Sequence, residues 1–94
     1  MKPNEIIKKN NDDKCLVLFK SIEQFINYPI VCKNTDIFSD LEEKLYLVFP
    51  EIKHKNINFF ANGNLIEKSA TLEENKIKND TTILIDGIGE ENYE

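Results

Sequence analysis

The residues of this chain that could do chemistry are one histidine, His54, and two cysteines, Cys15 and Cys32. A structural zinc site needs four ligands, and one imidazole with two thiols from separate segments cannot supply them without carboxylates that the spacing does not provide. A nucleophilic thiol needs an electropositive, accessible setting, whereas both cysteines lie in apolar runs, where burial raises the pKa of a thiol. We therefore expect no metal site and no catalytic residue, and we expect His54 to be exposed in a loop.

The acidic pairs of the sequence do not have the spacing of catalytic carboxylates. Glu42-Glu43, Glu73-Glu74 and Glu90-Glu91 are each adjacent in sequence, so the two side chains of a pair point apart or lie on a flexible tail. The chain has three glycines, and none of them stands in a phosphate-binding pattern. We expect no cofactor, and an enzyme ranks last among the functions considered.

Composition limits the classes of partner. The formal net charge is -5, and all twelve basic residues are lysines, so no guanidinium is present to make bidentate contacts with phosphates or guanine edges. We expect no nucleic-acid partner. No apolar run approaches the ~18 residues of a membrane span, and the N-terminus has no signal-peptide stretch. We expect no membrane association, a cytoplasmic or nuclear location, and reduced cysteines.

The length of 94 residues fits one small domain. Residues 1–14 and 87–94 are polar and charged, with few side chains that could pack. We therefore predict a polar N-terminal tail over residues 1–14, a folded domain over residues 15–86, and an acidic C-terminal tail over residues 87–94.

Two β-type runs, residues 15–19 and 28–32, predict a hairpin at the start of the domain. If its turn is centred between Ser21 and Ile26, facing residues have numbers that sum to 47. One face then holds the inward side chains, because side chains alternate along a strand. These are Cys15, Val17, Phe19, Tyr28, Ile30 and Cys32. Pro29 falls on the other face and lacks an N–H, so its strand should lie at an edge or bulge.

One helix and three further elements follow the hairpin. Asp36 is a good N-cap for a helix whose inward stripe is Phe38, Leu41, Leu45 and Val48 or Phe49, and Pro50 should end it. Strands are predicted at residues 57–61, 65–66 and 81–85, with Asn62-Gly63 as the tight turn between the first two. Thr71 and Glu74 match a capping box, which predicts a short helical turn that tucks Leu72 and Ile77 under the sheet.

This order of elements resembles that of ubiquitin and its relatives, over residues 15–86. From Phe59 to Ile85 the two sequences can be laid together without a gap, with Phe59, Ile66, Leu72, Ile77, Ile83 and Ile85 on core positions. The asparagine-glycine turn falls where ubiquitin has its own positive-φ turn. The resemblance implies an α+β class and a ubiquitin-like β-grasp fold, in which a mixed sheet of four to five strands packs on one main helix.

The resemblance also implies a protein-binding surface on the outer face of the sheet. Ubiquitin carries a small apolar patch there, and its positions correspond to Ile22, Phe60 and Leu84. Leu16, Leu18 and Val31 fall on the outward set of the first hairpin and would enlarge the patch. Such a group predicts a protein partner and weak self-association through this face, unless the N-terminal tail with Ile6-Ile7 folds back over it. Asp86 stands where the ubiquitin patch has a valine, so the proteins that bind ubiquitin itself need not bind this chain.

The C-terminal end departs from a conjugated modifier, which finishes in two adjacent glycines. Here Ile88 separates Gly87 from Gly89, and the acidic residues that follow end in Tyr93 and Glu94. Our first hypothesis is a non-conjugated ubiquitin-like interaction module, acting as an adaptor or as one domain of a larger protein. The alternative is a free-standing modifier that is processed near Gly89 and conjugated, and an enzyme is third.

Overall fold

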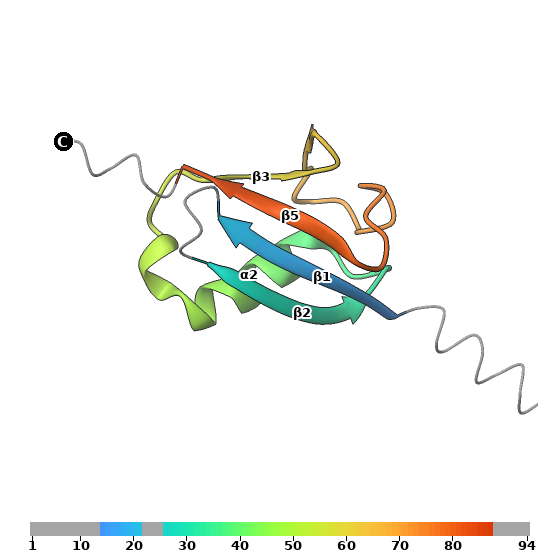
Figure 1. Cartoon of the computed structure of the whole chain (residues 1–94), viewed down its shortest axis with the longest axis horizontal. Helices are drawn as coiled ribbons and strands as arrows, with labels where there is room; N and C mark the ends of the chain where they lie inside the picture. Colours follow the sequence, from blue (N-terminus) through green and yellow to red (C-terminus); the bar gives the residue numbers. More distant parts are fainter. Residues whose placement is uncertain (1–13, 22–25, 88–94) are drawn as a thin grey trace, which may run out of the picture.

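A computed structural model describes residues 14–21 and 26–87 of the chain. In these residues five strands form one sheet, and a single α-helix packs across one of its faces (Figure 1). The elements are β1 (Lys14–Ser21), β2 (Asn27–Lys33), α2 (Phe38–Val48), the 3-10 turn η1 (Pro50–Ile52), β3 (Asn58–Ala61), β4 (Asn64–Leu65) and β5 (Thr81–Asp86). The strand order is β2-β1-β5-β3-β4, with β1 and β5 parallel and the other pairs antiparallel. The predicted α+β class and β-grasp architecture are confirmed.

The first two strands form the predicted hairpin in the predicted register. Facing residues sum to 47 in every pair, and Cys15 faces Cys32. The six predicted inward side chains are buried, except for Tyr28, which is half-buried against the core. β2 is the outer strand on its side of the sheet, so Pro29 lies at an edge, as its missing N–H requires.

The core lies between the helix and the inward face of the sheet. At its centre are three rings, Phe19 from β1, Phe38 from α2 and Phe59 from β3, each 0% exposed. Their centroids are 5.1 to 6.0 Å apart at tilted or edge-on angles, which are favourable arrangements for aromatic pairs. The predicted core positions are also buried, namely Leu41, Leu45, Ile66, Leu72, Ile77, Ile83 and Ile85.

The start of the helix differs from the prediction. α2 begins at Phe38, and its N-cap is Ile37, which makes no side-chain cap hydrogen bond. The carboxylate of Asp36 instead accepts the backbone N–H of Lys33 at 2.9 Å. The N–H of Phe38 donates to the carbonyl of Ala70 at 2.9 Å. The N-cap prediction is wrong, because a tertiary contact satisfies an N–H group that a local cap would otherwise have to satisfy.

The end of the helix decides between the two residues that the sequence left open. Phe49 takes the inward position and packs edge-on against Tyr28, with ring centroids 5.7 Å apart, whereas Val48 is 45% exposed. The helix ends at Val48, and Pro50 opens the η1 turn. Of the helices in the described part of the chain, none has the length and apolar character to span a membrane.

Two turns follow the predicted chemistry. Asn62 and Gly63 adopt φ of 54° and 81° and join β3 to β4 as a tight hairpin. The capping box is also present, since Thr71 Oγ1 accepts the N–H of Glu74 at 3.0 Å and Glu74 Oε1 accepts the N–H of Thr71 at 2.9 Å. The segment that it opens is shorter than a helix, because Lys76 adopts a left-handed φ of 61° and ends it after one turn.

Candidate interaction surface

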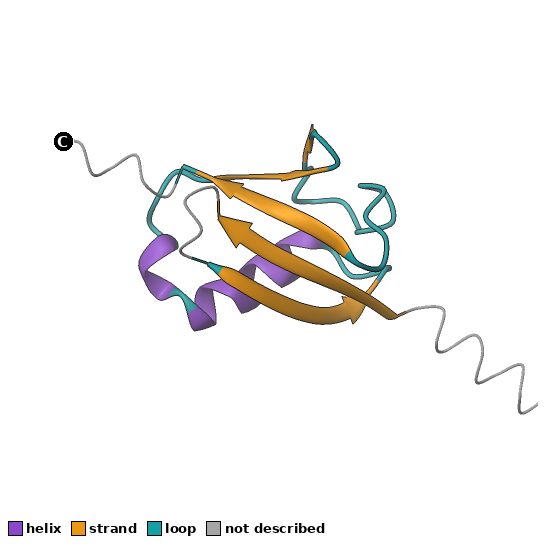
Figure 2. Ribbon diagram, viewed as in Figure 1, coloured by secondary structure: helices purple, strands orange, loops and turns teal. Residues whose placement is uncertain are grey.

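The face of the sheet opposite the helix carries exposed apolar side chains. In Figure 2 the helix lies behind the sheet, so the viewer looks onto this outward face. Val31 is 65% exposed, Leu84 39% and Leu16 38%, while Leu18 and Phe60 are half-buried. These are five of the six residues that the sequence assigned to a partner-binding patch. The sixth, Ile22, lies outside the described residues.

One part of the face is an apolar row across three strands. Phe60 of β3 has Leu84 of β5 as its partner on one side and Leu65 of β4 on the other. Leu65 is 62% exposed and was missed in the sequence analysis. The two-residue turn could have identified it, because a tight turn at Asn62-Gly63 places residues 60 and 65 opposite each other. The row therefore extends to the edge of the sheet.

A second apolar group covers the first hairpin. Leu16 faces Val31, and Leu18 faces Pro29, which is also exposed. Thr82, the neighbour of Leu18 on β5, lies between the two groups. We call the combined set the outer patch, and it consists of Leu16, Leu18, Pro29, Val31, Phe60, Leu65 and Leu84.

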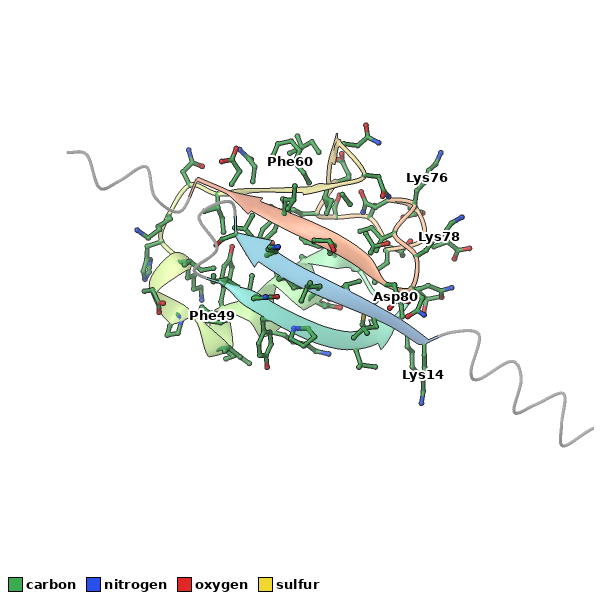
Figure 3. The ribbon with its side chains drawn as sticks, viewed as in Figure 1. Lys14, Phe49, Phe60, Lys76, Lys78 and Asp80 are labelled. Atoms are coloured by element: carbon green, nitrogen blue, oxygen red, sulfur yellow. The ribbon has the colours of Figure 1, made fainter. Side chains whose placement is uncertain are left out.

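The charges around the outer patch are mainly positive. Strand alternation places Lys14, Lys20 and Lys33 on the outward set of β1 and β2, and Lys14 and Lys33 are direct partners. Lys20 also pairs with Leu84 on β5 and stands two residues from Leu18 on β1, so this residue adjoins both apolar groups. In the described residues of this hairpin no carboxylate lies on the outward face, and Asp86 is at the far end of β5. Figure 3 shows Lys14 at the end of the sheet opposite to Phe49.

The free edge of β2 offers few groups to another strand. The N–H of Leu16 donates to Asn79 Oδ1 at 2.8 Å, and its carbonyl accepts the N–H of Asp80 at 2.7 Å. Because Leu16 directs both groups away from β2, its partner Val31 directs its own N–H and C=O to the free edge. Pro29, two residues earlier, faces the same way and has no N–H to offer.

Comparison with known proteins settles the fold. No protein-family model matches the chain, and no curated protein matches it. Solved structures do match, among them a designed protein based on ubiquitin, with 20% identity, a TM-score of 0.68, and coverage of 80% of this chain and 89% of that one. The chain has the ubiquitin-like fold. The solution structure of a ubiquitin-like domain of an Arabidopsis thaliana protein is also similar, with 19% identity, a TM-score of 0.65, and coverage of 77% and 74%.

The two thiols of the ubiquitin-like domain lie side by side on its inward face. Cys15 and Cys32 are free and are 2% and 6% exposed, and the thiol of Cys32 donates to the carbonyl of Cys15 at 3.2 Å. Burial raises the pKa of Cys15, and burial, with the neighbouring Cys15 as a lesser cause, raises the pKa of Cys32 to about 12. The prediction that both cysteines face the core and are packed there is confirmed. Neither thiol has the setting of a nucleophile.

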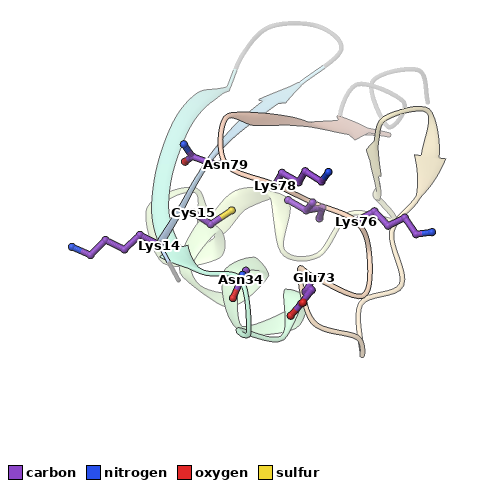
Figure 4. A pocket seen from close by; sticks show the side chains of 8 residues that line it. Lys14, Cys15, Asn34, Glu73, Lys76, Lys78 and Asn79 are labelled. Atoms are coloured by element: carbon purple, nitrogen blue, oxygen red, sulfur yellow. The ribbon is translucent and has the colours of Figure 1, made fainter. Parts of the chain in front are cut away.

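One cavity of about 320 Å³ lies beside Cys15, at the end of the ubiquitin-like domain where β1 begins. Lys14, Cys15, Asn34, Glu73, Lys76, Ile77, Lys78 and Asn79 line it. Its lysines do not converge, since Lys14 extends to one side and Lys76 and Lys78 to the other (Figure 4). His54 is exposed elsewhere, after η1, and no three potential metal ligands gather in residues 14–21 and 26–87.

Gly87 closes the described part of the chain and is held against the domain. Its φ is +110°, and a Cβ at this position would lie 2.8 Å from the carbonyl oxygen of Asn56 and 3.3 Å from Cα of Ile57. Only glycine fits this backbone conformation and this close approach without strain. The glycine is therefore part of the packed structure.

Proposed function

We propose that this ubiquitin-like domain is a non-conjugated interaction module, an adaptor or one domain of a larger protein, that binds a protein partner through the outer patch. The observation that carries the proposal is the exposure of Val31, Leu65, Leu84 and Leu16, at 65%, 62%, 39% and 38%, on one face of one sheet. Single exposed apolar side chains are ordinary on a protein surface. The outer patch, which with Phe60 of β3 has members on all five strands, is the kind of apolar group that is typical of an interaction site.

The chemistry of the surface also fits a protein partner. The two apolar groups offer burial area, and the half-buried ring of Phe60 at the centre of the row is the kind of aromatic anchor that interfaces favour. Ile22 is the remaining residue of the predicted contact surface and lies outside the described residues.

The position of Gly87 supports the non-conjugated form. An activating enzyme must draw an extended tail into its channel, and Gly87 is packed against Asn56. A product processed after Gly89 would have only Ile88 and Gly89 beyond that anchor. Two residues span at most about 7 Å, which is a short reach for a tail that must enter another protein.

The test of the proposal is a pull-down with the full chain and two matched variants from β3. Phe60→Ala removes the central side chain of the outer patch, and Asn58→Ala removes an exposed outward side chain two residues away, outside the patch. Proteins captured by the wild type and identified by mass spectrometry should be lost with Phe60→Ala and retained with Asn58→Ala. Capture that is equal for all three proteins would contradict the proposal.

The modifier hypothesis has its own test. The chain truncated after Gly89 is incubated with a ubiquitin-like activating enzyme and ATP, and a thioester is sought on a non-reducing gel. We expect none. A thioester that forms with this truncated chain, and is lost on reduction, would contradict the non-conjugated form and support the conjugated modifier.

A further inference from the structure

The backbone of the first hairpin holds its two cysteines at a separation that suits a disulfide. Cys15 of β1 faces Cys32 of β2, and both are free thiols. The N–H and C=O of Leu16 point away from β2, so those of Cys15 point toward it and the two cysteines form a hydrogen-bonded pair. The Cα atoms of such a pair are about 5.5 Å apart, within the range of about 4.4–6.8 Å that disulfides join.

The two side chains are also neighbours. The Sγ of Cys32 donates to the carbonyl oxygen of Cys15 at 3.2 Å, so this sulfur lies beside the backbone of Cys15. Burial raises the pKa of both thiols. The hydrogen bond between the two side chains opposes this rise in the pKa of Cys15 and adds to it in the pKa of Cys32. Cys15 is therefore the thiol that ionises more readily, and Cys32 is its hydrogen-bond donor.

The cavity at the start of β1 distinguishes the two thiols. Their exposed fractions, 2% and 6%, are too similar to do so, but Cys15 lines this cavity of about 320 Å³ and Cys32 does not. In Figure 4 the side chain of Cys15 points from β1 toward the segment that carries Lys76 and Lys78. A water molecule takes up about 30 Å³ in the liquid, so the cavity has room beside Cys15 for an oxidant as small as hydrogen peroxide.

We propose that Cys15 and Cys32 form a redox-sensitive pair, in which a peroxide oxidises Cys15 and Cys32 then closes a disulfide between β1 and β2. The inference goes beyond the proposed function and does not depend on it. It assigns different roles to two thiols that the sequence presents as equivalent.

The reaction has two steps. In the first, the thiolate of Cys15 attacks one oxygen of hydrogen peroxide, the O–O bond breaks, and the other oxygen leaves as hydroxide, which takes up the thiol proton as water. The product is a sulfenic acid on Cys15. In the second, the sulfur of Cys32 loses its proton and attacks the sulfur of Cys15, which forms the S–S bond and expels hydroxide, again as water. In total two thiols lose two hydrogens, and one hydrogen peroxide becomes two waters.

The reaction should be slow and reversible. The raised pKa values leave little thiolate at neutral pH, so the pair responds to sustained rather than brief oxidation. A thiol reductant restores both cysteines by exchange. The new bond joins the strands at the open end of the hairpin, beside Leu16 and Val31 on the opposite face. It therefore ties together the two strands that carry this cross-strand pair of the outer patch.

The test uses the full chain in native buffer with hydrogen peroxide. Catalase then removes the peroxide, the protein is unfolded in urea with iodoacetamide, and its mass is measured. We expect a single chain that is lighter by two hydrogens and carries no alkyl group. Peptide mapping should find the peptides of Cys15 and Cys32 joined, and dithiothreitol should restore two thiols that iodoacetamide labels.

The order of the two steps is tested with dimedone, which traps sulfenic acids. Dimedone present during oxidation of the wild type should label Cys15 and not Cys32. Two matched variants repeat the measurement, with serine chosen because its size is close to that of cysteine. Cys32→Ser should accumulate the sulfenic acid on Cys15, and Cys15→Ser should be oxidised at Cys32 at least about tenfold more slowly. Circular dichroism melts in reducing buffer check that both variants fold.

Several results would overturn the inference. One is a wild type that stays reduced over an exposure about a hundredfold longer than the urea-unfolded chain needs. Oxidation that adds oxygen without loss of hydrogen, or that joins two chains, would exclude the pair. Dimedone on Cys32 in place of Cys15 would exclude the assigned order. The pull-down with Phe60→Ala is carried out in reducing buffer, so the proposed function and the redox pair can fail independently.

Discussion

The two faces of the same sheet differ in what covers them. On the inward face the large apolar side chains are closely covered, with Phe19 of β1 and Ile85 of β5 at 0% exposure and Ile30 of the edge strand β2 at 8%. On the outward face Leu16, Leu84 and Val31 are 38% to 65% exposed, although they stand one residue away along the same strands. The chain supplies a helix for one apolar face, and the residues described here supply nothing for the other. An apolar face without a cover within its own domain is typical of a binding surface.

The faces also differ in how their side chains are held. Inward side chains are held in place by close packing, because three aromatic rings and the aliphatic side chains around them fill the space under the helix. Outward residues are aligned only by strand pairing, as in the row of Leu84, Phe60 and Leu65. A change on the inward face should therefore affect stability, and a change on the outward face should affect binding.

The largest expected effect is that of Phe59→Ala on the inward face. Phe59 is 0% exposed and contacts the rings of Phe19 and Phe38, so its removal leaves a cavity at the centre of the core. We expect a loss of about 3–5 kcal/mol in the free energy of unfolding, measured by urea denaturation. That loss is a large share of the ~5–15 kcal/mol of a small domain. A loss smaller than that of Phe60→Ala would show that the two faces are misassigned.

The buried thiols should make stability depend on pH in the alkaline range. Burial raises the pKa of Cys32 to about 12, whereas a thiol in the unfolded chain ionises near about 8.5. Between these values the unfolded state loses a proton that the folded state retains, so stability is full below about pH 8.5 and falls as the pH rises toward 12. Urea denaturation at a series of pH values should give a less steep fall for Cys32→Ala than for the wild type.

The same thiols should be protected from reagents. Cys15 and Cys32 are 2% and 6% exposed, so a thiol-reactive dye should label them slowly in the native protein and rapidly once denaturant is added. Rapid labelling of either cysteine in the native state would show that the inward face is open to solvent. It would also return the catalytic hypothesis to consideration.

Phe60→Ala should have a small effect on stability and a large effect on binding. Phe60 is half-buried on the outward face, where truncation leaves no closed cavity. We expect a change in the free energy of unfolding of no more than about 1 kcal/mol, together with loss of the captured partner. Equal losses of stability for Phe59→Ala and Phe60→Ala would remove the distinction between the faces.

The smallest expected effect on stability is that of Pro29→Val at the β2 edge. Pro29 is exposed, and valine fits a strand, so we expect a change within about 0.5 kcal/mol. The substitution restores an N–H that faces the open edge beside exposed Val31. Edge-to-edge association should then increase, and thioflavin binding and light scattering over time would measure it. Pro29→Ser also restores the N–H, but serine is polar and a poor strand former. It is therefore the control for the apolar character of the valine.

Most of the local structure could be predicted from residue types and their spacing. The hairpin register followed from alternation and the turn position, and the capping box followed from Thr71 and Glu74. Both depend on groups that are close in sequence. The N-cap at Asp36 failed for the opposite reason, because the N–H of Phe38 binds Ala70, which is distant in sequence.

The candidate surface was predictable in part. Alternation assigned Leu16, Leu18, Val31, Phe60 and Leu84 to the outward side of their strands. It did not reveal that Leu65 joins Phe60 or that Lys20 adjoins both apolar groups, because these neighbours depend on which strands are adjacent in the sheet.

The sequence by itself determined the spacing of apolar residues in each helix and strand, the turns, and which side chains share a face. These features depend on backbone geometry over a few residues. Only the tertiary structure decided what satisfies the first N–H of the helix, since the carbonyl of Ala70, which accepts the N–H of Phe38, is distant in sequence. It also decided that the parallel pairing of β1 and β5 lies at the centre of the sheet, and therefore that the outward leucines, valine and lysines form one surface.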